Sequence, residues 1–192
     1  MKKLSLLFAL VIGTASFSFS QQTTPMRTPP MRLTISAFDD GTVIPDKYTQ
    51  ASAAGAVSPE LTWNTVPPGT QSFVLYMHDI DVVRNRGLED YLHWLVWNIP
   101  GTAISLPEKM PDGAVLADGS RQISAGGAKY TGPGAPASGP LHHYVFELFA
   151  LDIKVDVPAG ANAADTKTSI MSQIQNHIIG KATYIGKFKR PM

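Results

Sequence analysis

The 192-residue sequence contains no cysteine, which excludes disulfide bridges, thiol nucleophiles and thiolate metal ligands. It also lacks a charge excess of either sign, because the formal net charge is +1. Nucleic-acid partners are therefore not expected, since binding to phosphates along a duplex needs a basic face. After the N-terminal segment, no stretch is apolar enough to cross a bilayer. Such a chain must be stabilised by its hydrophobic core.

The first 20 residues have the layout of a secretory signal peptide. A short basic start precedes an apolar segment that is too short for a comfortable membrane span, and Ser18 and Ser20 are small residues suited to a cleavage site. We therefore expect residues 1–20 to be removed and the protein to be exported, either periplasmic or secreted; an uncleaved anchor is the alternative. Segment 21–31 is polar and proline-rich, which predicts a flexible lead-in. Residues 32–192 are expected to form one domain.

Proline and glycine are abundant, with 15 and 16 residues, and the apolar runs are short. This combination predicts a mainly β, antiparallel domain with long Gly/Pro-rich loops. Segment 72–78 is almost continuously apolar, which is typical of a strand buried on both faces. The Gly- and Pro-rich segment 107–140 is long enough to be functional or disordered. Strands are expected at residues 32–37, 61–63, 72–78, 91–99, 142–151 and 181–189.

One helix is predicted, near the C-terminus, over residues 165–179. Its apolar positions Ile170, Ile174 and Ile178 recur every four residues and would form one buried stripe. The expected caps are Asp165 or Thr166 at the start and Gly180 at the end.

Three polar clusters interrupt or border the predicted strands. Each has an ordinary structural explanation, because paired aspartates form turns, a histidine in an apolar strand is often a core residue, and Gly-Pro marks a loop. Neighbouring strands could nevertheless bring the three clusters to one end of a sheet. The clusters are Asp79 with Asp81, His93 with Trp94, and the turn Tyr130–Pro133 leading to His142, His143 and Tyr144.

Taken together, the clusters contain the parts of an anion-binding pocket. Imidazoles and the hydroxyls of Tyr130 and Tyr144 donate hydrogen bonds, and Gly132 lets the backbone approach a ligand closely. The aspartates would repel a bare phosphate, but they would raise the pKa of a nearby histidine and could meet an ammonium group. A pocket with charges of both signs favours phosphoethanolamine over a bare sulfate.

At these clusters the sequence resembles the phosphatidylethanolamine-binding protein family, in its bacterial Raf-kinase-inhibitor-like branch. The segments that carry the resemblance are Ser58–Trp63, Val66–Asp81, Tyr91–Pro100, Tyr130–Pro136 and Leu141–Asp152. The resemblance implies an antiparallel β-sandwich with one C-terminal helix and a small cavity for phosphate-like anions or phospholipid headgroups. The implied ligand-binding residues are Asp79, Asp81, His93, Tyr130, Gly132, Pro133, His142 and Tyr144.

Three departures from the family pattern affect this site. Ile80 stands between the aspartates where proline is usual, which loosens the turn. Gly134 and Ala135 replace a usual Cys-Pro pair. His143 occupies a position that is commonly arginine, so a permanent charge and a forked set of donors are lost.

We expect a binding protein without catalytic residues, cofactor or resident metal. One alternative is an inhibitor or regulator of a protease or kinase that uses the loop 107–140. A hydrolase is disfavoured, because no Gly-x-Ser-x-Gly elbow and no His-Glu-x-x-His pair is present. Asp79, His93 and His142 would nevertheless satisfy the ligand count of a zinc site in principle. The sequence leaves the oligomeric state open, and only analogy with bacterial relatives suggests a homodimer.

Overall fold

A computed structural model describes residues 30–84, 86–160 and 162–192. The predicted signal peptide and most of the predicted lead-in lie outside the described residues. Within the described part of the chain, no helix is long and apolar enough to span a membrane. The elements are β1 (Arg32–Ile35), a 3-10 turn (Asp46–Tyr48), β2 (Leu61–Asn64), β3 (Ser72–Arg84), β4 (Glu89–Pro100), β5 (Ser105–Leu106), β6 (Arg121–Ile123), β7 (His142–Leu151), α1 (Ala163–Gln173) and β8 (Ile178–Phe188).

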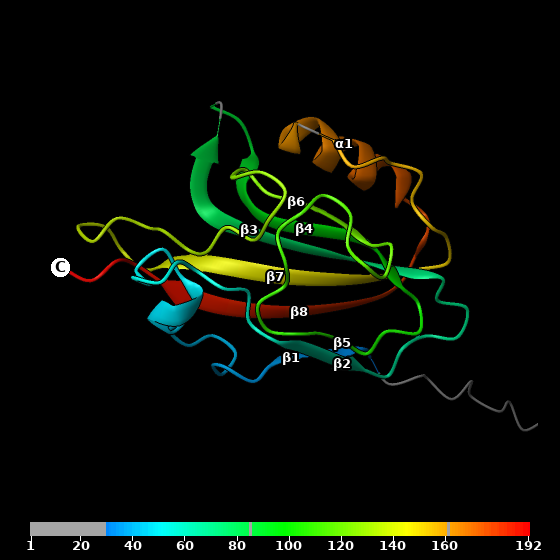
Figure 1. Ribbon diagram of the computed structural model, residues 1–192, viewed down its shortest axis with the longest axis horizontal. Coiled ribbons are helices and arrows are strands. Elements are labelled where there is room, and N and C mark those ends of the chain that lie inside the picture. Colours follow the sequence, from blue (N-terminus) through cyan, green and yellow to red (C-terminus); the bar gives the residue numbers. More distant parts are fainter. Residues whose placement is uncertain (1–29, 85, 161) are drawn as a thin grey trace, which may run out of the picture.

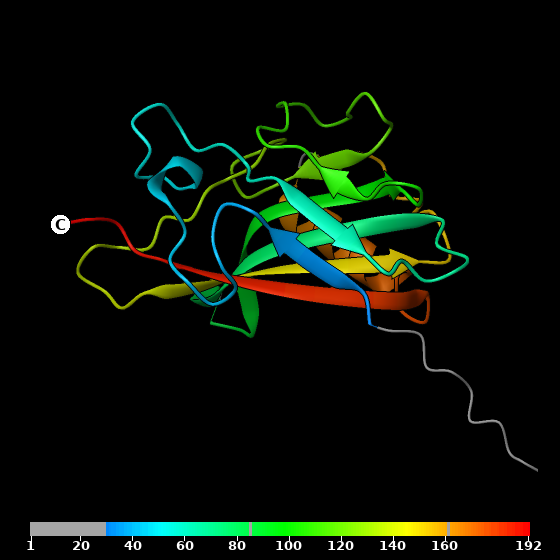
Figure 2. The ribbon, with the colours of Figure 1, turned by 90° about the horizontal axis from the view of Figure 1, so that it is seen from below.

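The strands form two antiparallel sheets that pack face to face (Figures 1 and 2). The large sheet has the order β6-β4-β3-β7-β8, and the small sheet has the order β1-β2-β5. The small sheet covers one face of the large sheet, while α1 covers the other (Figure 1). This arrangement confirms the predicted mainly β sandwich with one C-terminal helix.

Strand β3 lies at the centre of the large sheet and contributes to both layers of the core. Phe73, Leu75 and Met77 point into the main core under the small sheet. Val74 and Tyr76 alternate with them and pack in the second cluster, under α1. Burial on both faces explains why the run 72–78 is almost continuously apolar rather than alternating.

The structure contains the predicted C-terminal helix, but the helix begins two residues earlier and ends six residues earlier than predicted. Asn162 is the N-cap, since its side chain accepts from the backbone N–H groups of Ala164 and Asp165. The helix ends at Gln173, and Asn176 adopts a left-handed backbone with φ of 66°. Ile178 starts β8 and is 42% exposed. The helical spacing of Ile178 was therefore coincidental, because main-chain pairing of β8 with β7 replaces the last predicted turn.

Two further differences concern strand ends. Strand β3 continues to Arg84 rather than ending at residue 78, so Asp79 lies within a strand and not after it. The long loop 107–140 contains the short strand β6, which pairs with β4.

The outer side of β8 is covered by the segment 40–44. The N–H groups of Gly41 and Ile44 donate to the carbonyls of Ile185 and Lys187 at 2.7 and 2.8 Å, and Lys187 N–H donates to Thr42 O at 2.8 Å. On the opposite side of the large sheet, Val115 bridges Arg121 of β6.

Candidate ligand-binding site

An open cavity of about 300 Å³ lies where β3, β4 and β7 meet the segment 134–136. The register explains this meeting, because Asp79 of β3 pairs with Tyr91 of β4 on one side and with Tyr144 of β7 on the other. Three larger depressions on the described surface, of about 400, 690 and 660 Å³, have no histidine in their walls. The smaller cavity is lined by Gln50, Asp79, Val82, Arg84, Tyr91, His93, Gly134, Ala135, Pro136, His142 and Tyr144.

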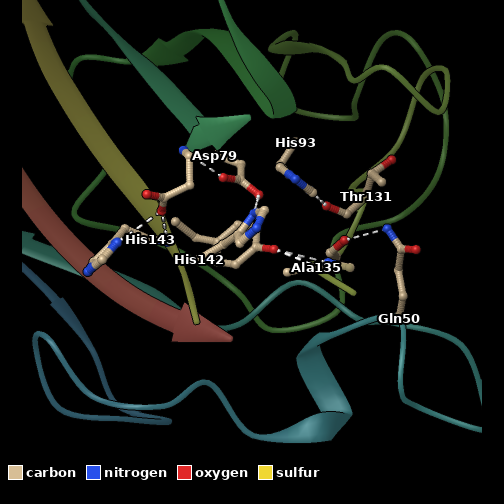
Figure 3. Close-up of polar contacts among 11 residues, drawn as sticks. Gln50, Asp79, His93, Thr131, Ala135, His142 and His143 are labelled. Atoms are coloured by element: carbon tan, nitrogen blue, oxygen red, sulfur yellow. Dashed lines mark hydrogen bonds and ion pairs between the residues drawn. The ribbon is translucent and has the colours of Figure 1, made fainter. Parts of the chain in front are cut away.

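His142 is held by a buried carboxylate. Its Nδ1 lies 2.8 Å from Oδ2 of Asp79, whose exposure is only 2% (Figure 3). The other carboxylate oxygen of Asp79 accepts from the main-chain N–H of Asp81 at 3.0 Å. With Nδ1 engaged in this way, Nε2 is the ring nitrogen of His142 that remains for a ligand.

His93 is held by a main-chain carbonyl. Its Nδ1 lies 2.8 Å from the carbonyl oxygen of Thr131 (Figure 3). Because a carbonyl only accepts, Nδ1 carries the hydrogen, and Nε2 of the neutral ring is an acceptor. Burial lowers the pKa of His93, against smaller opposing effects from the Thr131 carbonyl and Asp79. The ring also contacts Tyr91 and Tyr144, with centroids 4.9 and 5.0 Å away.

Tyr144 connects the strand to the rim of the cavity. Its hydroxyl oxygen accepts from the main-chain N–H groups of Gly134 at 3.3 Å and Ala135 at 3.1 Å. Burial, together with the nearby Asp79 carboxylate, raises the pKa of Tyr144, so it stays a neutral phenol. The hydroxyl therefore keeps a hydrogen that it can donate.

Four of the eight residues expected to bind ligand line this cavity, namely Asp79, His93, His142 and Tyr144. Tyr130 does not line it. Its hydroxyl donates to Tyr48 O at 2.8 Å, and its ring packs edge-on against Trp94 in the core. Tyr130 lies instead beside a separate depression of about 660 Å³, so the structure places it outside the cavity that His93 and His142 line.

Gly132 and Pro133 also lie outside the cavity, behind its rim. Their carbonyls accept from the side-chain amide and the main-chain N–H of Gln50, at 2.9 and 2.8 Å. A Cβ on Gly132 would lie 2.7 Å from Ala56 Cβ and 2.8 Å from Tyr48 O. The missing side chain therefore lets this segment pack closely, rather than opening a path to a ligand.

Asp81 pairs with His143 outside the cavity. Its Oδ2 accepts from the His143 main-chain N–H at 2.6 Å and lies 2.9 Å from the ring Nδ1 (Figure 3). Both side chains are partly exposed, at 36% and 41%. The geometry makes Asp81 a partner of β7 rather than a ligand contact.

Several lining residues were missed from the sequence. Arg84 and Tyr91 face each other across the β3–β4 hairpin, with the guanidinium carbon 4.9 Å from the ring centroid. Hairpin pairing could have predicted them had β3 been extended far enough. Gln50 comes from a distant loop, and no local pattern marks it. Gly134 and Ala135 stand out in the sequence only as departures from the family pattern, and Val82 and Pro136 are apolar residues without a distinguishing signal.

The described residues contain no group of three or more His, Asp or Glu side chains arranged to hold a metal. The zinc set considered from the sequence is not assembled, because Asp79 points one oxygen at His142 and the other at a main-chain N–H.

The fold and the cavity together define a two-sheet β-sandwich with a small polar pocket near one end of its large sheet. A family model described as phosphatidylethanolamine-binding protein matches residues 34–189. The chain belongs to the phosphatidylethanolamine-binding protein family, in the branch of the bacterial YbhB and YbcL proteins. Members of this family are generally ligand-binding proteins and not enzymes.

Individual relatives agree with this assignment. The UPF0098 protein of Methanothermobacter thermautotrophicus is 35% identical over 162 residues, which cover 83% of this chain and 99% of that protein. The crystal structure of Escherichia coli YbcL superposes with a TM-score of 0.67 at 25% identity, covering 84% of this chain and 99% of that one. A Mycobacterium tuberculosis protein named putative lipoprotein LppC is 34% identical over 163 residues, 83% of this chain and 73% of that protein.

Proposed function

We propose that the cavity binds a phosphate-bearing small molecule or a phospholipid headgroup such as phosphoethanolamine. The observation that carries this proposal is the matched orientation of two histidines. His93 and His142 each engage Nδ1 with an internal acceptor, and each lines the same cavity with Nε2 left over. The family name of the relatives supports the same class of ligand.

The two rings differ in the partner that holds Nδ1. His142 faces the carboxylate of Asp79 and presents Nε2 to the ligand. His93 is disposed to be neutral, and its Nε2 accepts from a protonated phosphate oxygen. The hydroxyl of Tyr144 and the guanidinium of Arg84 add donors on the remaining sides. Together these donors and the acceptor Nε2 of His93 best match a phosphate monoester with a proton on one of its phosphate oxygens.

The size and the charges of the cavity limit the ligand further. A volume of about 300 Å³ accommodates a headgroup and excludes most of a diacyl phospholipid. Asp79 is buried and negative, so a ligand that also carries an ammonium group is favoured over inorganic phosphate.

Calorimetry with phosphoethanolamine, O-phosphotyrosine and glycerophosphoethanolamine tests the proposal. We expect the two monoesters to bind more tightly than the diester, which has no proton to give to His93. His93→Ala and His142→Ala should weaken binding while leaving the fold intact. His177→Ala is the matched control, because His177 also contacts an aspartate, Asp152, at 2.8 Å, away from this cavity. No heat at millimolar ligand with folded protein would refute the proposal.

An inhibitor of a protease or kinase is the second candidate. Part of the 107–140 segment is held in one conformation by Gln122, whose side-chain amide donates to Pro111 O at 2.6 Å and Gly113 O at 3.0 Å. A preorganised loop binds a protein partner with less loss of entropy. Unchanged activity across a panel of proteases and kinases in the presence of excess protein would count against this candidate.

Export to the periplasm or the medium remains our proposal for localisation. It rests on the N-terminal pattern, and the putative lipoprotein among the relatives is consistent with it. Mass spectrometry of the mature N-terminus tests it, and a full-length chain starting at Met1 would contradict cleavage.

A further inference from the structure

The β3–β4 hairpin forms one wall of the cavity, and its attachment to the rest of the large sheet changes at Asp79. Main-chain pairing between β3 and β7 ends at the pair Asp79–Tyr144. Tyr91 of β4, which pairs with Asp79, and Val82 and Arg84 of β3, which lie beyond that point, line the cavity. Figure 1 shows the ends of these two strands curling away from β7. A contact other than the β3–β7 ladder therefore joins this part of the wall to β7.

Asp81 supplies that contact. Its carboxylate accepts a hydrogen bond from the main-chain N–H of His143. If the β3–β7 ladder continued past Asp79, a main-chain carbonyl of β3 would accept that hydrogen bond instead. The same oxygen faces the ring Nδ1 of His143 at 2.9 Å (Figure 3). The main-chain N–H of Asp81 is in turn fixed by Asp79. The side chain of Asp81 thus takes the place of the missing rung between β3 and β7.

We propose that Asp81 and His143 are positioning residues: their contact holds the hairpin so that Arg84 and Tyr91 close the cavity. The inference rests on the proposed function, because the cavity is the one in which a phosphate-bearing ligand is proposed to bind. Asp81 then acts on the ligand through the wall and not by touching it.

The contact stabilises the charge on Asp81. Although burial opposes it, the hydrogen bonds from the His143 main chain and ring lower the pKa of Asp81. Asp81 is therefore a carboxylate at neutral pH, and the hydrogen bond that it accepts from the His143 main-chain N–H is charge-assisted.

Hydrogen exchange of the hairpin tests the contact without any ligand. We compare amide protection factors in β3 and β4 next to the cavity for the wild type, Asp81→Asn, His143→Gln and His143→Arg. Protection in Asp81→Asn and His143→Gln should be about two- to five-fold lower than in the wild type, as expected when an exposed contact to a carboxylate is weakened. His143→Arg should keep at least the wild-type protection, because a guanidinium can still meet the Asp81 carboxylate.

Binding of phosphoethanolamine by the same four proteins tests the consequence for the cavity. Asp81→Asn and His143→Gln should bind about two- to five-fold more weakly than the wild type, and His143→Arg should retain the affinity. Two outcomes would overturn the positioning role alone. One is equal protection in all four proteins. The other is wild-type affinity in both Asp81→Asn and His143→Gln while His142→Ala fails to bind. A wild type that binds no ligand overturns the proposed function, and the exchange data then still decide whether the contact holds the hairpin.

Discussion

The Nδ1 atom of His142 lies 2.8 Å from Oδ2 of Asp79, although 63 residues separate the two along the chain. The pair joins β7 to β3, and its carboxylate has a side-chain exposure of only 3%. Both oxygens of Asp79 accept hydrogen bonds, so neither is left unpaired by its burial. The pair therefore contributes to the stability of the sheet as well as to the shape of the cavity.

Asp79→Asn should destabilise the protein by about 1–3 kcal/mol at neutral pH, because a buried charged hydrogen bond is lost. Chemical denaturation measures this change in the free energy of unfolding. Asp152→Asn is the matched control, since Asp152 pairs with His177 but both side chains are more than 40% exposed. Its cost should be below about 0.5 kcal/mol. Equal costs for the two variants would contradict a structural role for the buried pair.

The pH dependence of stability should reveal His93. Burial lowers the pKa of its imidazole in the folded state below the value in the unfolded chain. Its stabilising contribution is therefore complete above about pH 6.5 and is lost as the pH falls through the folded value. In His93→Asn this contribution is absent, so the free energy of unfolding should fall less steeply between about pH 6.5 and pH 5. Identical slopes for variant and wild type would show that His93 is protonated alike in both states.

Two buried tryptophans differ in one hydrogen bond, which allows a matched comparison. Trp94 Nε1 donates to Gln122 Oε1 at 2.8 Å, whereas Trp63 Nε1 has no partner in the described part of the chain. Truncation of either to alanine should cost about 3–5 kcal/mol. Replacement by phenylalanine should cost about 1–2 kcal/mol more at Trp94 than at Trp63, because Gln122 is left unpaired. Thermal and denaturant unfolding measure the difference, and a larger cost at Trp63 would contradict this account.

The segment behind the rim can be tested with two glycines. In Gly132→Ala the new methyl group meets Ala56 Cβ at 2.7 Å and the backbone oxygen of Tyr48 at 2.8 Å. We expect a loss of about 1–3 kcal/mol in stability from overpacking. In Gly134→Ala the methyl group meets only the side chain of Gln50, which can rotate away, so the loss should be smaller. Calorimetric melting of both variants measures the two losses of stability. A larger loss in Gly134→Ala than in Gly132→Ala would contradict this prediction.

The sequence predicted a strand correctly where one physical cause, such as burial on both faces, determines its hydrophobic pattern. Burial of β3 on both faces produced an unbroken apolar run, and the predicted strand matches its core. The end of β3 could not be predicted, because most of the residues 79–84 are polar or exposed and the segment pairs irregularly with β4. The helix was extended too far because Ile178 continued the helical spacing by coincidence, and the left-handed turn at Asn176 left no apolar signal.

The candidate site was predictable where side chains on neighbouring strands converge, as Asp79, His93 and His142 do. It was not predictable in the loop 130–136, because this segment approaches His93 through the carbonyl of Thr131 and not through a side chain. Tyr130 then turns inward to the core. Gln50 could not be placed, since its position beside Gly132 depends on the packing of two loops 82 residues apart.

The segment 40–44 beside β8 and the bridge from Val115 to β6 have a consequence for self-association. An uncovered outer strand is a template for strand addition by another chain. Here Thr42 and its neighbours hydrogen-bond to the main chain of β8. Ala114 and Leu116 form main-chain hydrogen bonds with Gln122 and Ser120, at β6 on the other edge of the large sheet. Continuous sheet formation between two copies is therefore blocked along these stretches. Edge pairing between two copies would have to use other stretches, such as the outer edges of β1 and β5 in the small sheet.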